Sequence, residues 1–121
     1  MIRDYHDQLV EKYNGVYNEV LKPLLALVEV AYEKHPSSIL NEIRAFNDHI
    51  ARCYRTNIDK AFIEDNLKRA SGHLKRSILD CLKYLNVWYH DKFVDFDRKH
   101  RGVDLTTISN GEFLSQYEPV A

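Results

Sequence analysis

The sequence is poor in the residues that interrupt helices and make turns. It has only four glycines and three prolines among 121 residues. A β-sandwich or β-barrel of this length needs many turns, and turns are rich in Gly, Pro, Asn and Asp. The scarcity of glycine and proline therefore argues against an all-β fold.

Long hydrophobic runs are also missing. The longest apolar stretch, Leu24 to Val28, is stopped by Glu29, whereas a membrane-spanning helix needs about 20 apolar residues. The first residues, Met1 to Asp4, do not form the basic-then-apolar pattern of a signal peptide. We therefore expect a cytoplasmic protein with no membrane segment.

Residues that bind metals or cofactors are few and poorly spaced. Cys53 and Cys81 form no Cys-x-x-Cys pair and fall on apolar positions, which is typical of reduced thiols that pack as small hydrophobes. The six histidines form neither Glu-x-x-His nor His-Glu-x-x-His, and the four glycines are too isolated for a phosphate loop. We predict no metal ion and no cofactor.

Hydrophobic residues recur every three or four positions in three long segments, which is the signature of amphipathic α-helices. We predict an all-α fold, an antiparallel bundle of three long helices over residues 1–101. In the tail, residues 102–121, the Ser109 to Glu112 capping box predicts a short C-terminal helix. The hydrophobic positions are Tyr5, Leu9, Tyr13, Val16, Val20, Leu24, Leu27 and Ala31 in the first segment, Ile39, Ile43, Phe46, Ile50 and Cys53 in the second, and Ile63, Leu67, Ala70, Leu74, Ile78, Cys81 and Leu85 in the third.

Local signals predict where these helices start or bend. Pro23 lacks a backbone donor and presses on the carbonyl of Glu19, so a kink or a restart is expected there. Thr56 or Asn57 is expected to cap the third helix. A break of that helix near Gly72 is the alternative to one continuous rod.

The three segments differ in length. The third could run about 60 Å at 1.5 Å per residue, and the second would cover only about half of it. The surplus must lie against the first helix, fold back or meet another chain, and we favour a homo-oligomer. Large aromatic residues near its end are expected to anchor the interface, although beside lysines they could also stack bases: Trp88, Tyr89, Phe93 and Phe96. The favoured function is an interaction or oligomerisation module with no catalytic site demonstrable from sequence.

The net charge is −1, but residues 36–101 carry thirteen basic and nine acidic side chains. Arg69, Arg76 and Lys83 are spaced by seven and align along one line of the third helix. Such a stripe could bind RNA, other nucleic acid or an acidic protein partner. The alternative is a solvated face on which Arg76 pairs with Asp80 at i,i+4. The stripe comprises Lys68, Arg69, Lys75, Arg76 and Lys83.

Polar residues flank the apolar stripes of the second and third helices. If these borders face each other, His49 and His73 meet, with Arg52 and Asp80 as charge partners. A histidine held by a carboxylate can act as a general base near neutral pH; the alternative is a hydrogen-bonded rim around the core. The borders carry Glu42, His49 and Arg52 on one helix and Asn66, His73, Ser77 and Asp80 on the other.

The segment Arg44-Ala45-Phe46-Asn47-Asp48-His49 resembles the Arg-x4-His motif of the HEPN superfamily. That resemblance implies a small, often dimeric all-α bundle from a toxin or phage-defence system, which cleaves RNA across a dimer cleft. It also implies that Arg44 and His49 activate a ribose hydroxyl and stabilise the phosphate. A helical wheel separates these two residues by about 140°, so a distorted turn or a dimer partner is needed for both to reach one phosphate.

Overall fold

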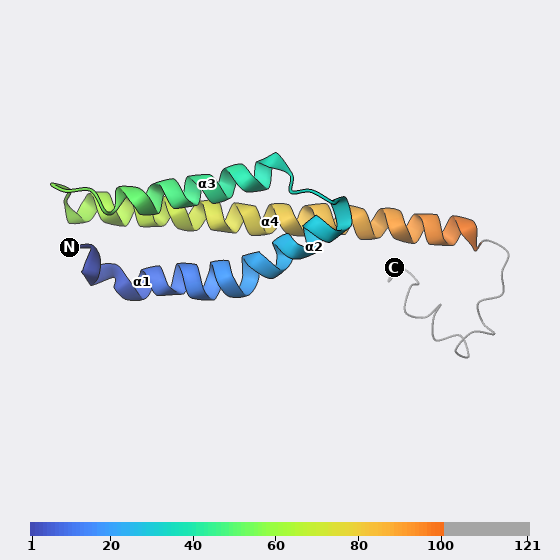
Figure 1. The fold of residues 1–121 in the computed structure, drawn as a ribbon, viewed down its shortest axis with the longest axis horizontal. Coiled ribbons are helices and arrows are strands. Elements are labelled where there is room, and N and C mark those ends of the chain that lie inside the picture. The colour runs from blue at the N-terminus through green and yellow to red at the C-terminus, as the bar shows by residue number, and fades with distance from the viewer. Residues whose placement is uncertain (101–121) are drawn as a thin grey trace, which may run out of the picture. The chain divides into compact units, whose positions relative to one another are not determined.

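The computed structural model describes residues 1–100, and this part of the chain is helical between short loops, without strands. The all-α class expected from the sequence is confirmed. The short helix expected from Ser109 lies outside the described residues. The helices are η1 (Ile2–Tyr5, a 3₁₀-helix), α1 (His6–Val10), η2 (Glu11–Leu21, a π-helix), α2 (Lys22–Tyr32), α3 (Ser37–Arg52) and α4 (Lys60–Lys99) (Figure 1).

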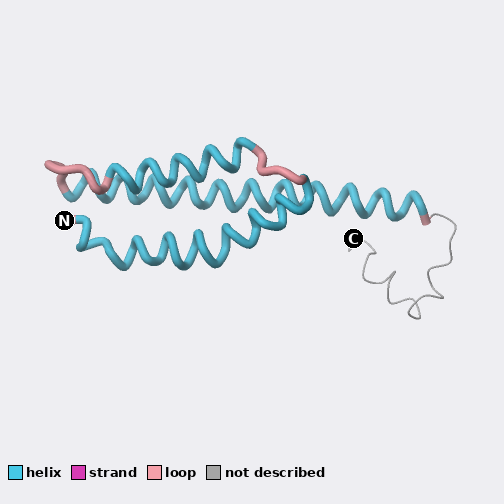
Figure 2. Tube along the Cα trace, viewed as in Figure 1, coloured by secondary structure: helices cyan, strands magenta, loops and turns pink. Residues whose placement is uncertain are grey.

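The chain divides into two units, Met1–Trp88 and the residues from Tyr89 onward. In the first unit η1, α1, η2 and α2 follow one another without a loop, and we call Ile2–Tyr32 the N-terminal stretch. This stretch, α3 and α4 run side by side in alternating directions (Figures 1 and 2). In the described part of the second unit α4 ends at Lys99, and the ring of the following His100 stacks on Phe96 with centroids 4.2 Å apart.

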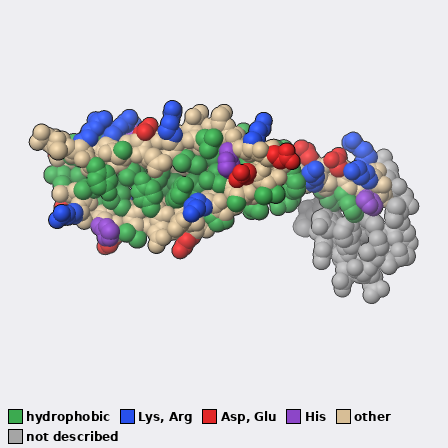
Figure 3. Space-filling model, viewed as in Figure 1, with side chains coloured by type: hydrophobic (Ala, Val, Ile, Leu, Met, Phe, Trp, Pro, Cys, Tyr) green, Lys and Arg blue, Asp and Glu red, His purple; other side chains and the backbone are tan. Residues whose placement is uncertain are grey.

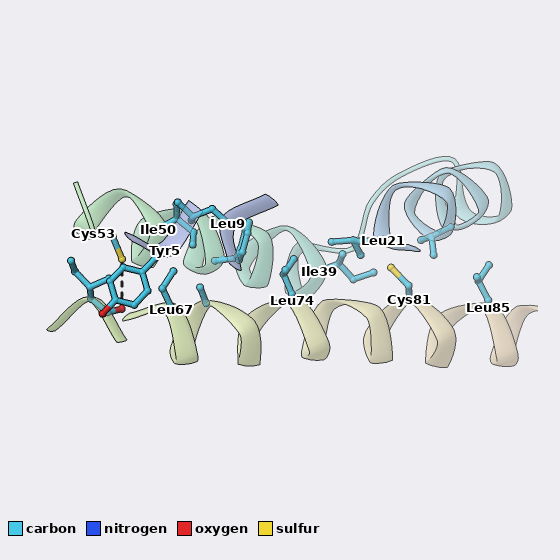
Figure 4. Close-up of a cluster of buried hydrophobic side chains, with 14 residues drawn as sticks. Tyr5, Leu9, Leu21, Ile39, Ile50, Cys53, Leu67, Leu74, Cys81 and Leu85 are labelled. Atoms are coloured by element: carbon cyan, nitrogen blue, oxygen red, sulfur yellow. Dashed lines mark hydrogen bonds between the residues drawn. The ribbon is translucent and has the colours of Figure 1, made fainter. Parts of the chain in front are cut away.

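One continuous core fills the first unit (Figure 4). Phe46 of α3 is completely buried and meets the ring of Tyr13 edge-on, with centroids 5.2 Å apart. The regular stripes expected for α3 and α4 are observed, because both helices keep the α-helical period. The buried hydrophobic residues of α4 are Ile63, Leu67, Ala70, Leu74, Cys81 and Leu85.

The stripe expected for the first helix is only partly observed: Val16, Leu24 and Ala31 pack against the core, but the prediction is wrong for Val20 and Leu27. Val20 and Leu27 are 43% and 48% exposed, whereas Leu21 and Val28 are completely buried. The cause is the π-helical η2, whose i→i+5 hydrogen bonds hold more residues in each turn than an α-helix and so rotate the following buried face by one residue. The α-helical register resumes at Lys22, beside Pro23, where the sequence predicted a kink or a restart.

The start and continuity of α4 also differ from some expectations. The helix runs through Gly72, so the alternative of a break there is wrong. Its first turn is capped by Asp59, whose Oδ1 accepts a hydrogen bond from the Phe62 backbone N–H at 2.9 Å, rather than by Thr56 or Asn57. None of the described helices combines the length and apolar character that crossing a membrane requires.

Candidate functional site

The most organised polar group of the described residues lies between α3 and α4. The rings of His49 and His73 stack with centroids 5.3 Å apart and planes 13° from parallel. The sequence predicted this meeting from the angular positions of the two borders. Both side chains are half-buried, one from each helix, so the pair lies where the core gives way to solvent.

The ring orientation of His49 follows from its neighbour Asn66, which is almost fully buried. The Asn66 amide donates from Nδ2 to the carbonyl of Phe62 at 2.9 Å, so its Oδ1 faces His49 Nδ1 at 2.8 Å. An amide oxygen only accepts, and therefore Nδ1 of His49 carries the hydrogen. Its Nε2 is left for a proton or another hydrogen bond.

The second histidine is held in the same way by a carboxylate. His73 Nδ1 lies 2.6 Å from Glu42 Oε2, and both side chains are about three-quarters buried. The Nδ1–H donates to the carboxylate, so Nε2 is again the remaining ring nitrogen. Glu42 is therefore the charge partner of the two stacked histidines. The prediction that Asp80 is a charge partner of these histidines is wrong, because Asp80 makes no ion pair within the described chain.

Arginine side chains border both ends of the stack. Arg52 Nη1 lies 3.4 Å from His49 Nδ1 and Arg76 Nη1 lies 3.5 Å from His73 Nδ1. Because each Nδ1 hydrogen is already directed at Asn66 or Glu42, neither arginine can donate to it. These are close approaches that leave the guanidinium donors available.

A solvent-facing hollow of about 360 Å³ opens at the His49 end of this network. It contains one carboxylate, Asp65, which is bound by Arg69 at 2.9 Å. Arg52 and Arg55 form no ion pair with any carboxylate of the described chain. The hollow is therefore basic. Its walls are His49, Arg52, Arg55, Phe62, Asp65, Asn66 and Arg69.

The two thiols are poor candidates for nucleophiles. Burial raises the pKa of Cys53, and burial together with the charge of Asp80 raises the pKa of Cys81 to about 11. Both remain protonated at neutral pH, whereas the thiolate is the reactive form. No group of three or more metal-ligating side chains occurs in residues 1–100.

The structure does not bring Arg44 to His49. Arg44 is exposed, and α3 is a regular α-helix over both residues, so they point to different sides. The basic stripe of α4 is also divided. Lys68 and Lys75 line a hollow beside α1 and η2, whereas Arg69 belongs to the hollow beside α3.

The remaining residues of the predicted sets lie elsewhere on α4. Lys83 is exposed, and Arg76 approaches His73 instead of pairing with Asp80. Tyr89 and Phe93 are exposed, Trp88 and Phe96 are half-buried, and each of these four aromatics has an interaction partner. Their role as an oligomer interface stays a prediction.

A second surface combines exposed hydrophobic side chains of two neighbouring segments. Tyr13, Val20 and Leu27 lie on the N-terminal stretch, Leu40 lies on α3, and Tyr54 lies in the loop just after α3. We call these five residues the apolar face. The face in Figure 3 shows a band of hydrophobic side chains where the two elements run beside each other.

Tyr13 joins the two rows. Its hydroxyl donates to Asn47 Oδ1 at 3.3 Å, midway along the α3 row. Burial, then the nearby Tyr54 and Tyr17, raise the pKa of Tyr13. The rows therefore lie close enough to form one surface.

Sequence reasoning missed Arg55, Phe62 and Asp65 in the basic hollow, because Arg55 lies in a loop and the other two in the first turns of α4. It also placed the row of Val20 and Leu27 in the core, because the π-helix has no recognised sequence signal. No protein-family model, curated protein or solved structure matches the chain. Functional inference therefore rests on the geometry of the molecule.

Proposed function

We propose that this protein is a helical interaction module that pairs with a second copy of itself through the apolar face. The observation that supports it is the exposure of two parallel hydrophobic rows on neighbouring helices. Monomeric proteins seldom leave a contiguous apolar surface of this kind in water. A two-fold axis on this surface would bring the same rows of both copies together.

The pattern of the rows suits a helical partner. Exposed hydrophobic side chains on two adjacent helical segments can receive the side chains of a facing helix between them. A second copy offers two helices of the same pattern. In this arrangement the four rows form a four-helix contact, and the net charge of −1 opposes it little.

The test compares two double variants of the full chain. Val20→Lys with Leu40→Lys places two cations in the apolar face, whereas Val87→Lys with Leu79→Lys changes the same residue types at exposed positions of α4. Light scattering should give a dimer for the wild type and the α4 variant and a monomer for the apolar-face variant. A dimer that survives Val20→Lys with Leu40→Lys, in a folded protein, contradicts the proposal.

The HEPN-like ribonuclease reading stays a prediction. Because Arg44 and His49 point to different sides of α3, a shared phosphate needs Arg44 from one copy and His49 from another. An RNA-cleavage assay of the wild type, Arg44→Ala and His49→Ala decides it. Cleavage lost in both variants supports that reading, and a wild type that leaves RNA intact contradicts it.

Nucleic-acid binding by the basic stripe is likewise a prediction. Reversing the charges of Arg69 and Arg76 should then abolish retention on immobilised RNA, and retention in the wild type should fall steeply with salt. Retention that is unchanged by the reversal contradicts this use of the stripe.

A further inference from the structure

We infer that the basic hollow between α3 and the start of α4 binds a phosphate monoester. The inference concerns a different surface from the apolar face and does not depend on self-association. It rests on the number, type and availability of the hydrogen-bond donors that converge in the hollow.

Three guanidinium groups line the hollow, from the end of α3, the following loop and the third turn of α4: Arg52, Arg55 and Arg69. The single carboxylate, Asp65, occupies only Arg69. A guanidinium presents five N–H donors in a planar fork that matches phosphate oxygens. Arg52 and Arg55 therefore hold a set of directed donors that no carboxylate of the described chain neutralises.

His49 adds a group of defined orientation. Its Nδ1–H is fixed on the buried Asn66, which is in turn fixed on the Phe62 carbonyl. These two hydrogen bonds hold the His49 ring against the core and leave its Nε2 available. In the imidazolium form this Nε2 would donate to a phosphate oxygen beside Arg52.

The chemistry favours phosphate over a carboxylate ligand. Three guanidinium groups can together donate to three terminal oxygens and offset a charge near −2, whereas a carboxylate has two oxygens and one charge. The hollow is also of a size that small ligands use. Phe62 in its wall gives a flat surface on which a base attached to the phosphate could stack.

The binding test uses the full chain, calorimetric titration and constant ionic strength set with potassium chloride. Inorganic phosphate and adenosine 5′-monophosphate are the two probes. Arg52→Gln with Arg55→Gln should weaken binding of both at least tenfold, since charge-assisted hydrogen bonds are lost. Arg3→Gln is the matched control, because Arg3 is an exposed arginine of η1 outside the hollow, and it should leave binding unchanged.

A variant that gains affinity provides an independent check. Asp65→Asn releases Arg69 and removes the only negative charge from the hollow, so phosphate should bind severalfold more tightly. Asp65 and both arginines are exposed, and circular dichroism confirms the fold of each variant.

The two probes separate the sources of the phosphate group. Tighter binding of the nucleotide, reduced to the level of inorganic phosphate by Phe62→Leu, assigns a nucleotide. Equal binding of both probes assigns the phosphate group alone. Absence of saturable binding of either probe, or equal effects of Arg3→Gln and the double variant, overturns the inference.

Discussion

Glu42 Oε2 of α3 and His73 Nδ1 of α4 lie 2.6 Å apart at the border of the core. This contact and the stacked histidine beside it connect the two helices through polar groups, next to the apolar contacts of Phe46 and Leu74. Because the site is about three-quarters buried, the hydrogen bond is partly protected from competing water.

Replacing Glu42 with Gln should destabilise the fold by about 1 kcal/mol, since a charge-assisted hydrogen bond becomes a neutral one. Urea unfolding measures this difference. Glu19→Gln, at an exposed position of η2, is the control and should change the unfolding free energy by no more than a few tenths of a kcal/mol.

A double-mutant cycle isolates the pair itself. Combining Glu42→Gln with His73→Asn should give a coupling energy of about 1 kcal/mol. A coupling close to zero would show that the two side chains act independently in spite of their short separation.

Alkaline pH should destabilise the protein. The pKa of Cys81 is raised to about 11 in the folded state, while an exposed thiol titrates near 9. The folded chain thus holds this proton more tightly than the unfolded chain between these values, and stability falls as pH rises from about 9 to 11. Raised pKa values of Cys53, Tyr5 and Tyr13 act in the same direction.

Urea midpoints between pH 7 and pH 11 test this pH dependence. Cys81→Ala should lower stability at pH 7, because it leaves space in the core, and should reduce the further loss above pH 9. An equally steep alkaline loss in wild type and Cys81→Ala would rule out the thiol as a contributor.

The cap of α4 gives a separate stability prediction. Asp59→Ala should cost about 1 kcal/mol, because the Phe62 N–H loses its side-chain acceptor. Thr56→Ala, at one of the two positions that the sequence predicted as the cap, should cost little. Thermal unfolding of both variants measures the difference, and a reversed order would assign the cap to Thr56.

The parts of the fold that were predictable are those with an unbroken α-helical period. In α3 and α4 a constant 100° per residue carries the apolar stripe from end to end, so Phe46 and Leu74 are buried as expected. The same helical period predicted that His49 and His73 meet, as they do. In the N-terminal stretch the period of 100° per residue does not hold, because the π-helical η2 has more residues per turn. As a result Val20 is exposed and Leu21 is buried.

The polar site was predictable only where it lies on helix faces. His49 and Asn66 could be assigned to facing borders, but the choice of Glu42 over Asp80 depends on the rotation of one helix against the other. Arg55 lies in the loop that connects α3 and α4, where no period applies. The basic hollow therefore emerged only from the three-dimensional arrangement.

Sedimentation equilibrium of the full chain over a hundredfold range of concentration shows whether the apolar face joins two copies. The expected result is a reversible monomer–dimer equilibrium with a mass limit near twice 14.3 kDa, abolished by Val20→Lys with Leu40→Lys. A mass of one chain at every concentration would contradict it.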